Sequence, residues 1–97
     1  MPTEKEIVLH GEKALQVVDV LNSTTLKILK AARTAPISVT KLSEDLKLSE
    51  AYISEQVRAL EDLNLVSITY ERGKRGIRKI STSALEKITI ILKDEEL

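Results

Sequence analysis

The sequence predicts a mainly α-helical single domain with one small antiparallel β-hairpin, an α+β fold that spans residues 1–97. Three observations support this class. Several stretches repeat aliphatic residues every three or four positions, which is the pattern of an amphipathic helix. Residues 66–71 alternate apolar and polar side chains, as a half-buried strand does. Gly73 and Gly76 then offer the backbone freedom that a hairpin turn requires.

Two helices are expected before the centre of the chain. The first covers residues 1–21, because Thr3 and Glu6 fit a capping box and aliphatic residues follow at helical spacings. Gly11 is expected to bend or break it. The second helix begins after Asn22 or Ser23, either of which suits an N-cap. Residues 37–39 are predicted to form a short strand.

A helix-turn-helix is predicted for residues 38–64. Leu42 and Leu46 lie four positions apart on a short helix, and Ser49 is placed to cap the next one after a tight turn. That second helix carries an apolar stripe on Ile53, Val57 and Leu60. Two such helices with a shared apolar seam form a helix-turn-helix, in which the second helix reads DNA.

A basic hairpin follows directly, over residues 65–82. Residues 71–79, ERGKRGIRK, hold 5 of the 15 basic residues of a chain that also has 15 acidic residues. A hairpin placed after a helix-turn-helix makes a winged helix, here in the order α-α-(β)-α-α-β-β-α. The last helix is expected at 83–97, because Ser83 and Glu86 fit another capping box.

Both terminal helices carry more aliphatic surface than one small core can cover. We therefore expect residues 1–21 and 83–97 to be dimerisation helices, since a wide apolar stripe needs a partner. The expected dimer interface comprises Val8, Leu15, Leu85, Ile88, Ile91 and Leu92.

Three stretches carry a family likeness: VLNSTTLKIL, ISVTKLSEDLKLSEAYISEQVRALEDLNLVSI and ERGKRGIRKIS. From roughly Val20 to Leu92 the chain resembles the ArsR-type (arsenic-repressor-like) winged helix-turn-helix transcriptional regulators, as a small archaeal-like member. MarR-like regulators and small archaeal winged-helix proteins share much of this motif. The resemblance implies a small homodimer that binds operator DNA and is released by a signal.

The chain departs from the metal sensors of that family. Some sensors carry cysteines at the start of the helix that precedes the reading helix, where this chain has Ser38-Val39-Thr40-Lys41. Others carry Asp and His on the last helix, where Thr82 and Ala84 stand here. His10 is the only histidine and there is no cysteine, so we expect no metal and no cofactor.

The expected DNA contacts lie on the reading helix and the wing. Basic wing residues neutralise phosphates, while the helix offers groups to base edges. These residues are Ser49, Ala51, Tyr52, Ser54, Glu55, Arg58, Arg72, Lys74, Arg75 and Arg78. Residues 50–62 hold one Arg and four acids, so the alternative that this helix packs on a protein stays open.

Function is expected to be binding rather than catalysis. The chain has no cysteine, one histidine and no glycine-rich phosphate loop, so an enzyme is not expected. No apolar run approaches a membrane span, and the protein is expected in the cytoplasm, associated with the nucleoid. Abundant Lys and Glu with little Asn, Gln, Met and Cys favour a thermophilic source.

The sequence thus predicts a transcriptional regulator, a repressor that binds specific double-stranded DNA as a homodimer. Two alternatives stay open. One is a weakly specific chromatin or architectural DNA-binding protein with the same fold. The other is a winged-helix module for protein–protein interaction.

Overall fold

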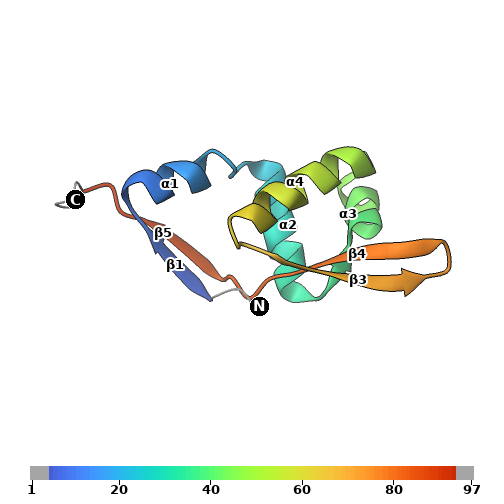
Figure 1. Ribbon diagram of the computed structural model, residues 1–97. Helices are drawn as coiled ribbons and strands as arrows, with labels where there is room; N and C mark the ends of the chain where they lie inside the picture. Colours follow the sequence, from blue (N-terminus) through green and yellow to red (C-terminus); the bar gives the residue numbers. More distant parts are fainter. Residues whose placement is uncertain (1–4, 94–97) are drawn as a thin grey trace.

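The computed structural model describes residues 5–93, which form an elongated molecule with extents of 53 × 25 × 19 Å. Its wing hairpin lies at one end, and a unit made from both ends of the described chain lies at the other (Figure 1). The elements in chain order are β1 (Glu6–Leu9), α1 (Gly11–Val18), α2 (Ser23–Thr34), β2 (Ile37–Ser38), α3 (Val39–Leu46), α4 (Glu50–Asp62), β3 (Ser67–Gly73), β4 (Gly76–Thr82) and β5 (Lys87–Ile90).

The three central helices begin at side-chain caps, of which the sequence predicts those of α2 and α4. Asn22 caps α2: its side chain accepts a hydrogen bond from the Thr25 N–H at 2.8 Å, and the Thr25 hydroxyl accepts one from the Asn22 N–H at 2.9 Å. Ser49 caps α4 by accepting from the Tyr52 N–H at 3.1 Å. Ser38 caps α3, and Lys47 ends that helix in the left-handed region with φ of 59°. The helix-turn-helix prediction is therefore confirmed in its local detail.

The apolar stripes of these helices meet in one core. The buried side chains of α4 face those of α2 and α3, which explains the spacing seen in the sequence. The core continues toward the chain ends through residues of β1, α1 and the segment before β5. Its members include Ile28, Leu42, Ile53, Val57, Leu60 and Leu65 in the centre, and Leu9, Ala14, Val17 and Leu85 toward the ends.

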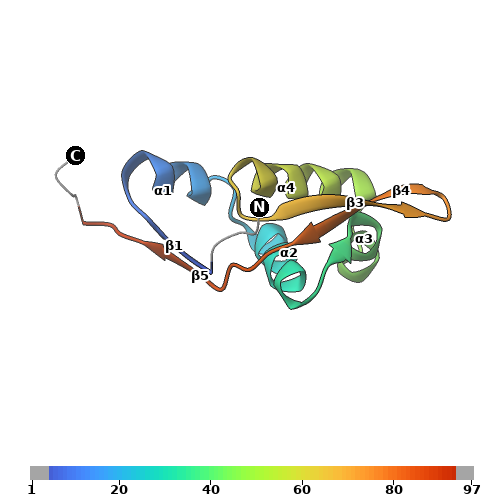
Figure 2. The same ribbon diagram turned by 60° about the horizontal axis from the view of Figure 1, so that its bottom comes forward.

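The wing is an antiparallel hairpin in a three-stranded sheet of order β2-β4-β3. The β3–β4 register runs from Ser67 opposite Thr82 to Gly73 opposite Gly76, so only Lys74 and Arg75 form the loop. Gly76 has φ of +117°, a conformation that other residues rarely adopt. The hairpin projects beyond the helices, as Figure 2 shows from a second direction.

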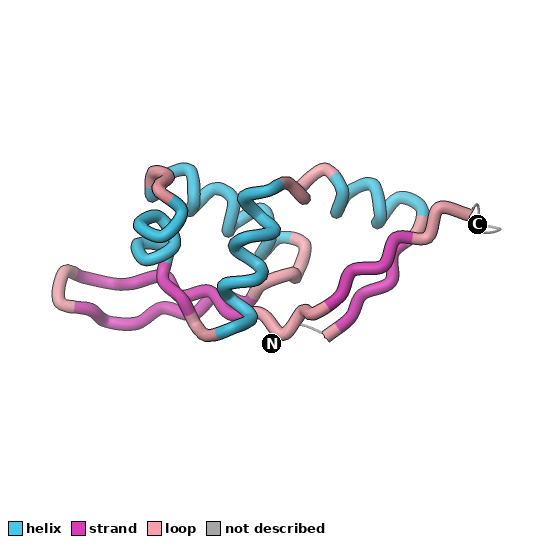
Figure 3. Tube along the Cα trace, turned by 180° about the vertical axis from the view of Figure 1, so that it is seen from behind, coloured by secondary structure: helices cyan, strands magenta, loops and turns pink. Residues whose placement is uncertain are grey.

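The predicted terminal helices are wrong. Residues 6–9 of the expected first helix form a strand, and only residues 11–18 are helical; Thr3 of the expected capping box lies outside the described residues. In the described part of the expected helix at 83–97, residues 83–93, the structure has β5 instead; β5 pairs with β1 in parallel, from Glu6 opposite Lys87 to Leu9 opposite Ile90. The two strands lie side by side in Figure 3.

The physical reason is a two-residue alternation that outweighs the helical spacing. Ile88, Thr89, Ile90 and Ile91 are all β-branched, which favours a strand. Ile7, Leu9, Ile88 and Ile90 share the face that packs on the core containing Ala14 and Val17 of α1. The opposite face carries Glu6, Lys87 and Thr89 together with the exposed Val8.

Polar contacts on that outer face join the two strands. Lys87 Nζ lies 3.7 Å from Glu6 Oε2, and the Thr89 hydroxyl donates to the same carboxylate at 3.3 Å. The unit of residues 5–21 and 83–93, called the terminal unit below, is also tied to α2. Arg33 Nη2 donates to Glu86 Oε2 at 2.9 Å, and this guanidinium holds the pKa of the Glu86 carboxyl below its ordinary value.

Candidate nucleic-acid interface

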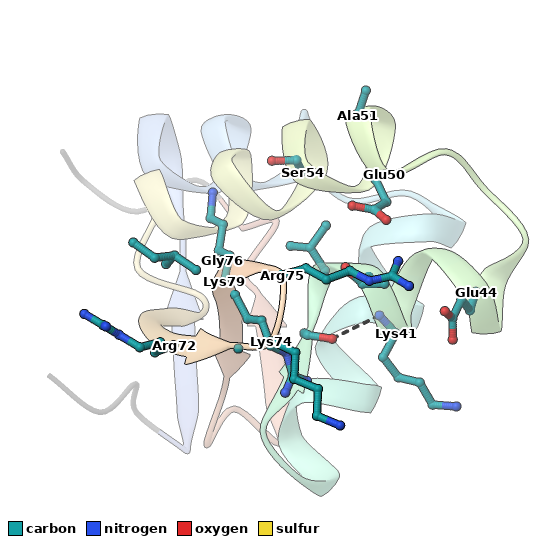
Figure 4. A pocket seen from close by; sticks show the side chains of 16 residues that line it. Lys41, Glu44, Glu50, Ala51, Ser54, Arg72, Lys74, Arg75, Gly76 and Lys79 are labelled. Carbon is teal, nitrogen blue, oxygen red and sulfur yellow. Dashed lines mark hydrogen bonds between the residues drawn. The ribbon is translucent and has the colours of Figure 1, made fainter.

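A cleft of about 1220 Å³ separates the wing from the helix-turn-helix. One wall consists of Ser38 of β2, residues 39–41 and Glu44 of α3, and Glu50, Ala51 and Ser54 of α4. The other wall is the wing, residues 72–79. Figure 4 shows charged side chains from both walls around this space. The N-terminal ends of α3 and α4 therefore face the basic hairpin.

The hairpin fixes where the basic side chains lie. Arg72 precedes the last ladder pair, Lys74 and Arg75 occupy the two-residue loop, and Arg78 and Lys79 return along β4. A Cβ atom at Gly73 would lie 2.7 Å from Arg78 Cδ, so the glycine leaves room for the aliphatic stem of Arg78. The wing thus presents its cations from a short, well-paired strand rather than from a long loop.

The electrostatic balance of the cleft is positive. Six basic residues line it, against the two acids Glu44 and Glu50; the six are Lys41, Arg72, Lys74, Arg75, Arg78 and Lys79. Lys41 also forms an ion pair with Asp45 on α3 at 3.1 Å between Nζ and Oδ1. A chain with zero formal charge therefore concentrates a net positive field in this cleft.

The predicted DNA contacts divide into three groups in the structure. Arg72, Lys74, Arg75, Arg78, Ala51 and Ser54 are brought together in the cleft. Tyr52, Glu55 and Arg58 are exposed on α4 but do not line the cleft. The Ser49 side chain accepts the capping hydrogen bond, so its first role is to begin α4.

Sequence reasoning missed the contribution of α3. Lys41 and Glu44 face the wing, because the cap at Ser38 sets the first turns of α3 against β4. Ser38 itself pairs with Ile80 of β4 through β2. The usable signal was the short strand predicted at 37–39, since a strand that joins the wing sheet places the following helix beside it. Lys79 and Glu50 were also missed.

This arrangement suits a polyanion with grooves. Arginine and lysine neutralise phosphates without reading sequence, whereas exposed polar groups on a helix can reach base edges in the major groove. The major groove, about 12 Å wide, admits one helix. The wing can then follow the adjacent backbone or minor groove.

The residues predicted for the dimer interface lie in the terminal unit but differ in exposure. Leu15 is 64% exposed and Leu92 is 91% exposed, and Val8 is exposed as well. Ile88 and Ile91 are partly buried. Leu85 is only 6% exposed, so it packs in the chain's own core and has little surface to offer a partner.

Within residues 5–93, no group of three His, Cys, Asp or Glu side chains is arranged to hold a metal ion. No helix in the same part of the chain is long and apolar enough to cross a membrane.

The fold and the cleft define a winged helix-turn-helix protein, the class in which a reading helix and a basic hairpin approach nucleic acid together. Solved structures share this fold. HlyU from Vibrio cholerae N16961 aligns with a TM-score of 0.62 and 26% identity, over 73% of this chain and 74% of that one. The reduced form of HlyU aligns with a TM-score of 0.61 and 25% identity, over 73% of this chain and 72% of that one. NolR from Sinorhizobium fredii aligns with a TM-score of 0.62 and 24% identity, over 75% of this chain and 70% of that one.

Residues 22–67 match the family described as "Bacterial regulatory protein, arsR family". This family match covers the helix-turn-helix, and over residues 22–67 it confirms the resemblance seen in the sequence. Proteins of this type bind double-stranded DNA and regulate transcription. None of the curated proteins compared with the chain matches it.

Proposed function

We propose that the protein is a repressor that binds specific double-stranded DNA as a homodimer. The observation that carries the proposal is the shared cleft, in which the basic wing stands opposite the N-terminal ends of α3 and α4. A duplex held there would meet wing cations on its phosphates. The exposed Tyr52, Glu55 and Arg58 of α4 supply base-edge readers of mixed donor and acceptor type.

The negative charge of α4 argues for selectivity rather than against binding. A helix with one Arg and four acids gains little from phosphates, so affinity rests on the wing. The acids of α4 repel the phosphates, and only the correct bases offset this repulsion by hydrogen bonding to α4. Wrong bases leave it uncompensated. Occupancy of a promoter by such a protein excludes other proteins, and repression is the direct result.

The wing is tested by replacing Lys74 and Arg75 with Ala and measuring DNA affinity over a range of salt concentrations. Binding should weaken by similar factors on every sequence, and the slope of log K against log salt should shrink by about 0.9 for each phosphate that is no longer neutralised. The matched control replaces Lys13 and Lys93, exposed cations of the terminal unit, and removes the same charge. Equal losses of DNA affinity in the two variants would contradict phosphate binding by the wing.

The reading helix is tested by Glu55→Gln. Removing this exposed carboxylate should raise affinity for random DNA and relax the preference at one base position in each half-site. Glu12→Gln on α1 removes the same charge far from the cleft and should leave base preference unchanged. Selection of preferred sites from random duplexes reads out both variants. Unchanged selection with Glu55→Gln would mean that α4 docks differently.

The same binding assays separate the alternatives. An architectural protein would bind random and selected DNA about equally well. A protein-docking module, the role that the acidic α4 favours, would bind neither. The homodimer is tested independently of DNA, by sedimentation of the wild type at micromolar concentration, where the proposal requires a two-chain species.

A further inference from the structure

The β1–β5 pair in the terminal unit is an incomplete sheet. Within residues 5–93 it has two strands only, and neither has a second neighbour. Two-stranded sheets are marginally stable, and parallel strands occur almost entirely inside larger sheets. An unpaired edge also presents backbone N–H and C=O groups that another strand can use.

The ladder identifies which backbone groups point to the open edges. The carbonyl oxygens of Lys5 and Leu9 accept hydrogen bonds from the N–H groups of Lys87 and Ile91, at 3.2 and 2.8 Å. Because backbone groups alternate between the two edges of a strand, the residue between these two on β5, Thr89, also faces β1. Ile88 and Ile90 therefore direct their N–H and C=O groups to the outer edge of β5.

We propose that the outer edge of β5 pairs with β5 of a second copy, antiparallel about a two-fold axis at Thr89. This inference rests on the homodimer proposed above and specifies how it forms. The product is one four-stranded sheet of order β1-β5-β5-β1. Ile88 exchanges hydrogen bonds with Ile90 of the second copy, and Thr89 stands opposite Thr89 of the second copy.

The side chains match this register. Ile88 and Ile90 lie on the inner face with α1, so pairing them across the axis extends one aliphatic layer through both copies. On the outer face Thr89 meets Thr89, a favourable cross-strand pair. Lys87 falls opposite Ile91 of the second copy, so no like charges face each other. That outer face also carries the Glu6–Lys87 ion pair and remains suited to water.

The helical layer fits the same axis. Strands are spaced about 4.8 Å apart, so helices centred over each pair of strands lie about 9.6 Å apart across the axis. Packed helices are separated by about 8–10 Å. The two-fold keeps both α1 helices on one face of the sheet. Leu15 and Val18 of α1, which are 64% and 46% exposed and one turn apart, are the apolar side chains that this helix contact would cover.

The helix contact is needed for a stable dimer. Four residues of β5 give an edge only about 13 Å long. Such an edge cannot alone bury the roughly 1,200 Å² that stable complexes bury. Strand pairing therefore sets the register, and the apolar α1 surface supplies most of the burial.

The β1 edge is the weaker choice. It offers the backbone groups of Glu6 and Val8, and Glu6 already binds Lys87 and Thr89 on the outer face. A two-fold on that edge pairs the backbone of one charged residue and one valine with the second copy, instead of the backbone of two isoleucines. Cross-linking distinguishes the two edges.

Cysteine cross-linking tests the register, because the chain has no cysteine of its own. Thr89→Cys should give a disulfide-linked dimer on mild oxidation at micromolar concentration, since residues on the axis lie within disulfide reach. Val8→Cys is the control: two β1 strands would stand about 14 Å apart, three strand spacings, and should not cross-link. The reverse pattern would place the two-fold at Val8 of β1 and overturn the proposal.

A second pair of variants tests the hydrogen bonds. Ile90→Pro removes an N–H that points to the outer edge and takes no part in the β1 ladder, whereas Ile90→Ala keeps it. Sedimentation should show a larger rise in the dimer dissociation constant for Pro, by tenfold or more over Ala. Equal effects, or a wild-type dimer in which neither cysteine cross-links, would overturn the β5 pairing and leave the homodimer standing. A wild-type monomer would overturn both.

Discussion

The helix-turn-helix with its wing and the terminal unit follow different rules in the same chain. Within residues 22–82 each element carries its own signal: a side-chain cap, an apolar stripe, or glycines at a turn. In the terminal unit each strand has four residues, and its partner lies at the other end of the described chain. The elements of the first region can be recognised from the local sequence. The terminal unit forms only when two strands far apart in the sequence pair. Because each strand has four residues, the terminal unit is stabilised by a smaller packed surface.

The largest expected effect is on the core of the first region. Ile53→Ala, at a fully buried position of α4, should lower the free energy of unfolding by about 2–5 kcal/mol. Ile88→Ala makes the same change in the partly buried β5 and should cost less. Chemical denaturation of both variants checks this difference. Equal losses of unfolding free energy in the two variants would mean that the two regions unfold as one unit and that Ile53 and Ile88 are equally well packed.

The next effect is on assembly. Ile88→Glu puts a carboxylate on the inner face of β5, which should release the terminal unit and abolish the proposed dimer. Operator affinity should then fall by roughly 10²-fold, because the second half-site is no longer tethered. Val8→Glu, on the outer face of β1, should leave sedimentation and affinity near the wild type. Dimers that persist in Ile88→Glu would contradict this role for β5.

A smaller effect concerns two buried serines of the wing sheet, with opposite expected signs. The Ser81 hydroxyl is fully buried and has no hydrogen-bond partner within the described residues, so Ser81→Ala should raise stability by about 1 kcal/mol. Ser38 is also buried, but it caps α3, and Ser38→Ala should lower stability by about 1 kcal/mol. Thermal unfolding measures both variants. A loss of stability in Ser81→Ala would mean that its hydroxyl is hydrogen-bonded in solution.

The smallest effect lies where the two regions meet, at the ion pair of Arg33 and Glu86. The folded-state pKa of Glu86 is lowered by the hydrogen bond and charge of Arg33 from an ordinary value of 4.5. The pair therefore stabilises fully above that value, and the contribution is lost as the pH falls through the lowered folded pKa. Glu86→Gln should lower the Tm slightly at pH 7 and match the wild type at pH 2. A Tm difference that persists at pH 2 would assign the effect to packing.

The contrast between the regions also explains what the sequence can predict. Asn22 and Ser49 mark helix starts by side-chain chemistry, and the structure places the caps there. The basic wing residues come together because a two-residue loop leaves them no other arrangement. Ile88 and Ile90, by contrast, satisfy a helical stripe and a strand alternation equally well over so few residues. Pairing with β1 decides between helix and strand for this segment, and nothing in the local sequence identifies β1 as the partner.

The β1–β5 pairing also imposes an order of events during synthesis. Glu6 and Lys87 are ladder partners, so β1 must wait for about 80 further residues, which takes roughly 4–16 s at 5–20 residues per second. The reading helix and wing are translated within that interval. The surface proposed for self-association is therefore the last to be completed. Neighbouring nascent chains on one messenger RNA cannot join through β5 before each has made its own DNA-reading half.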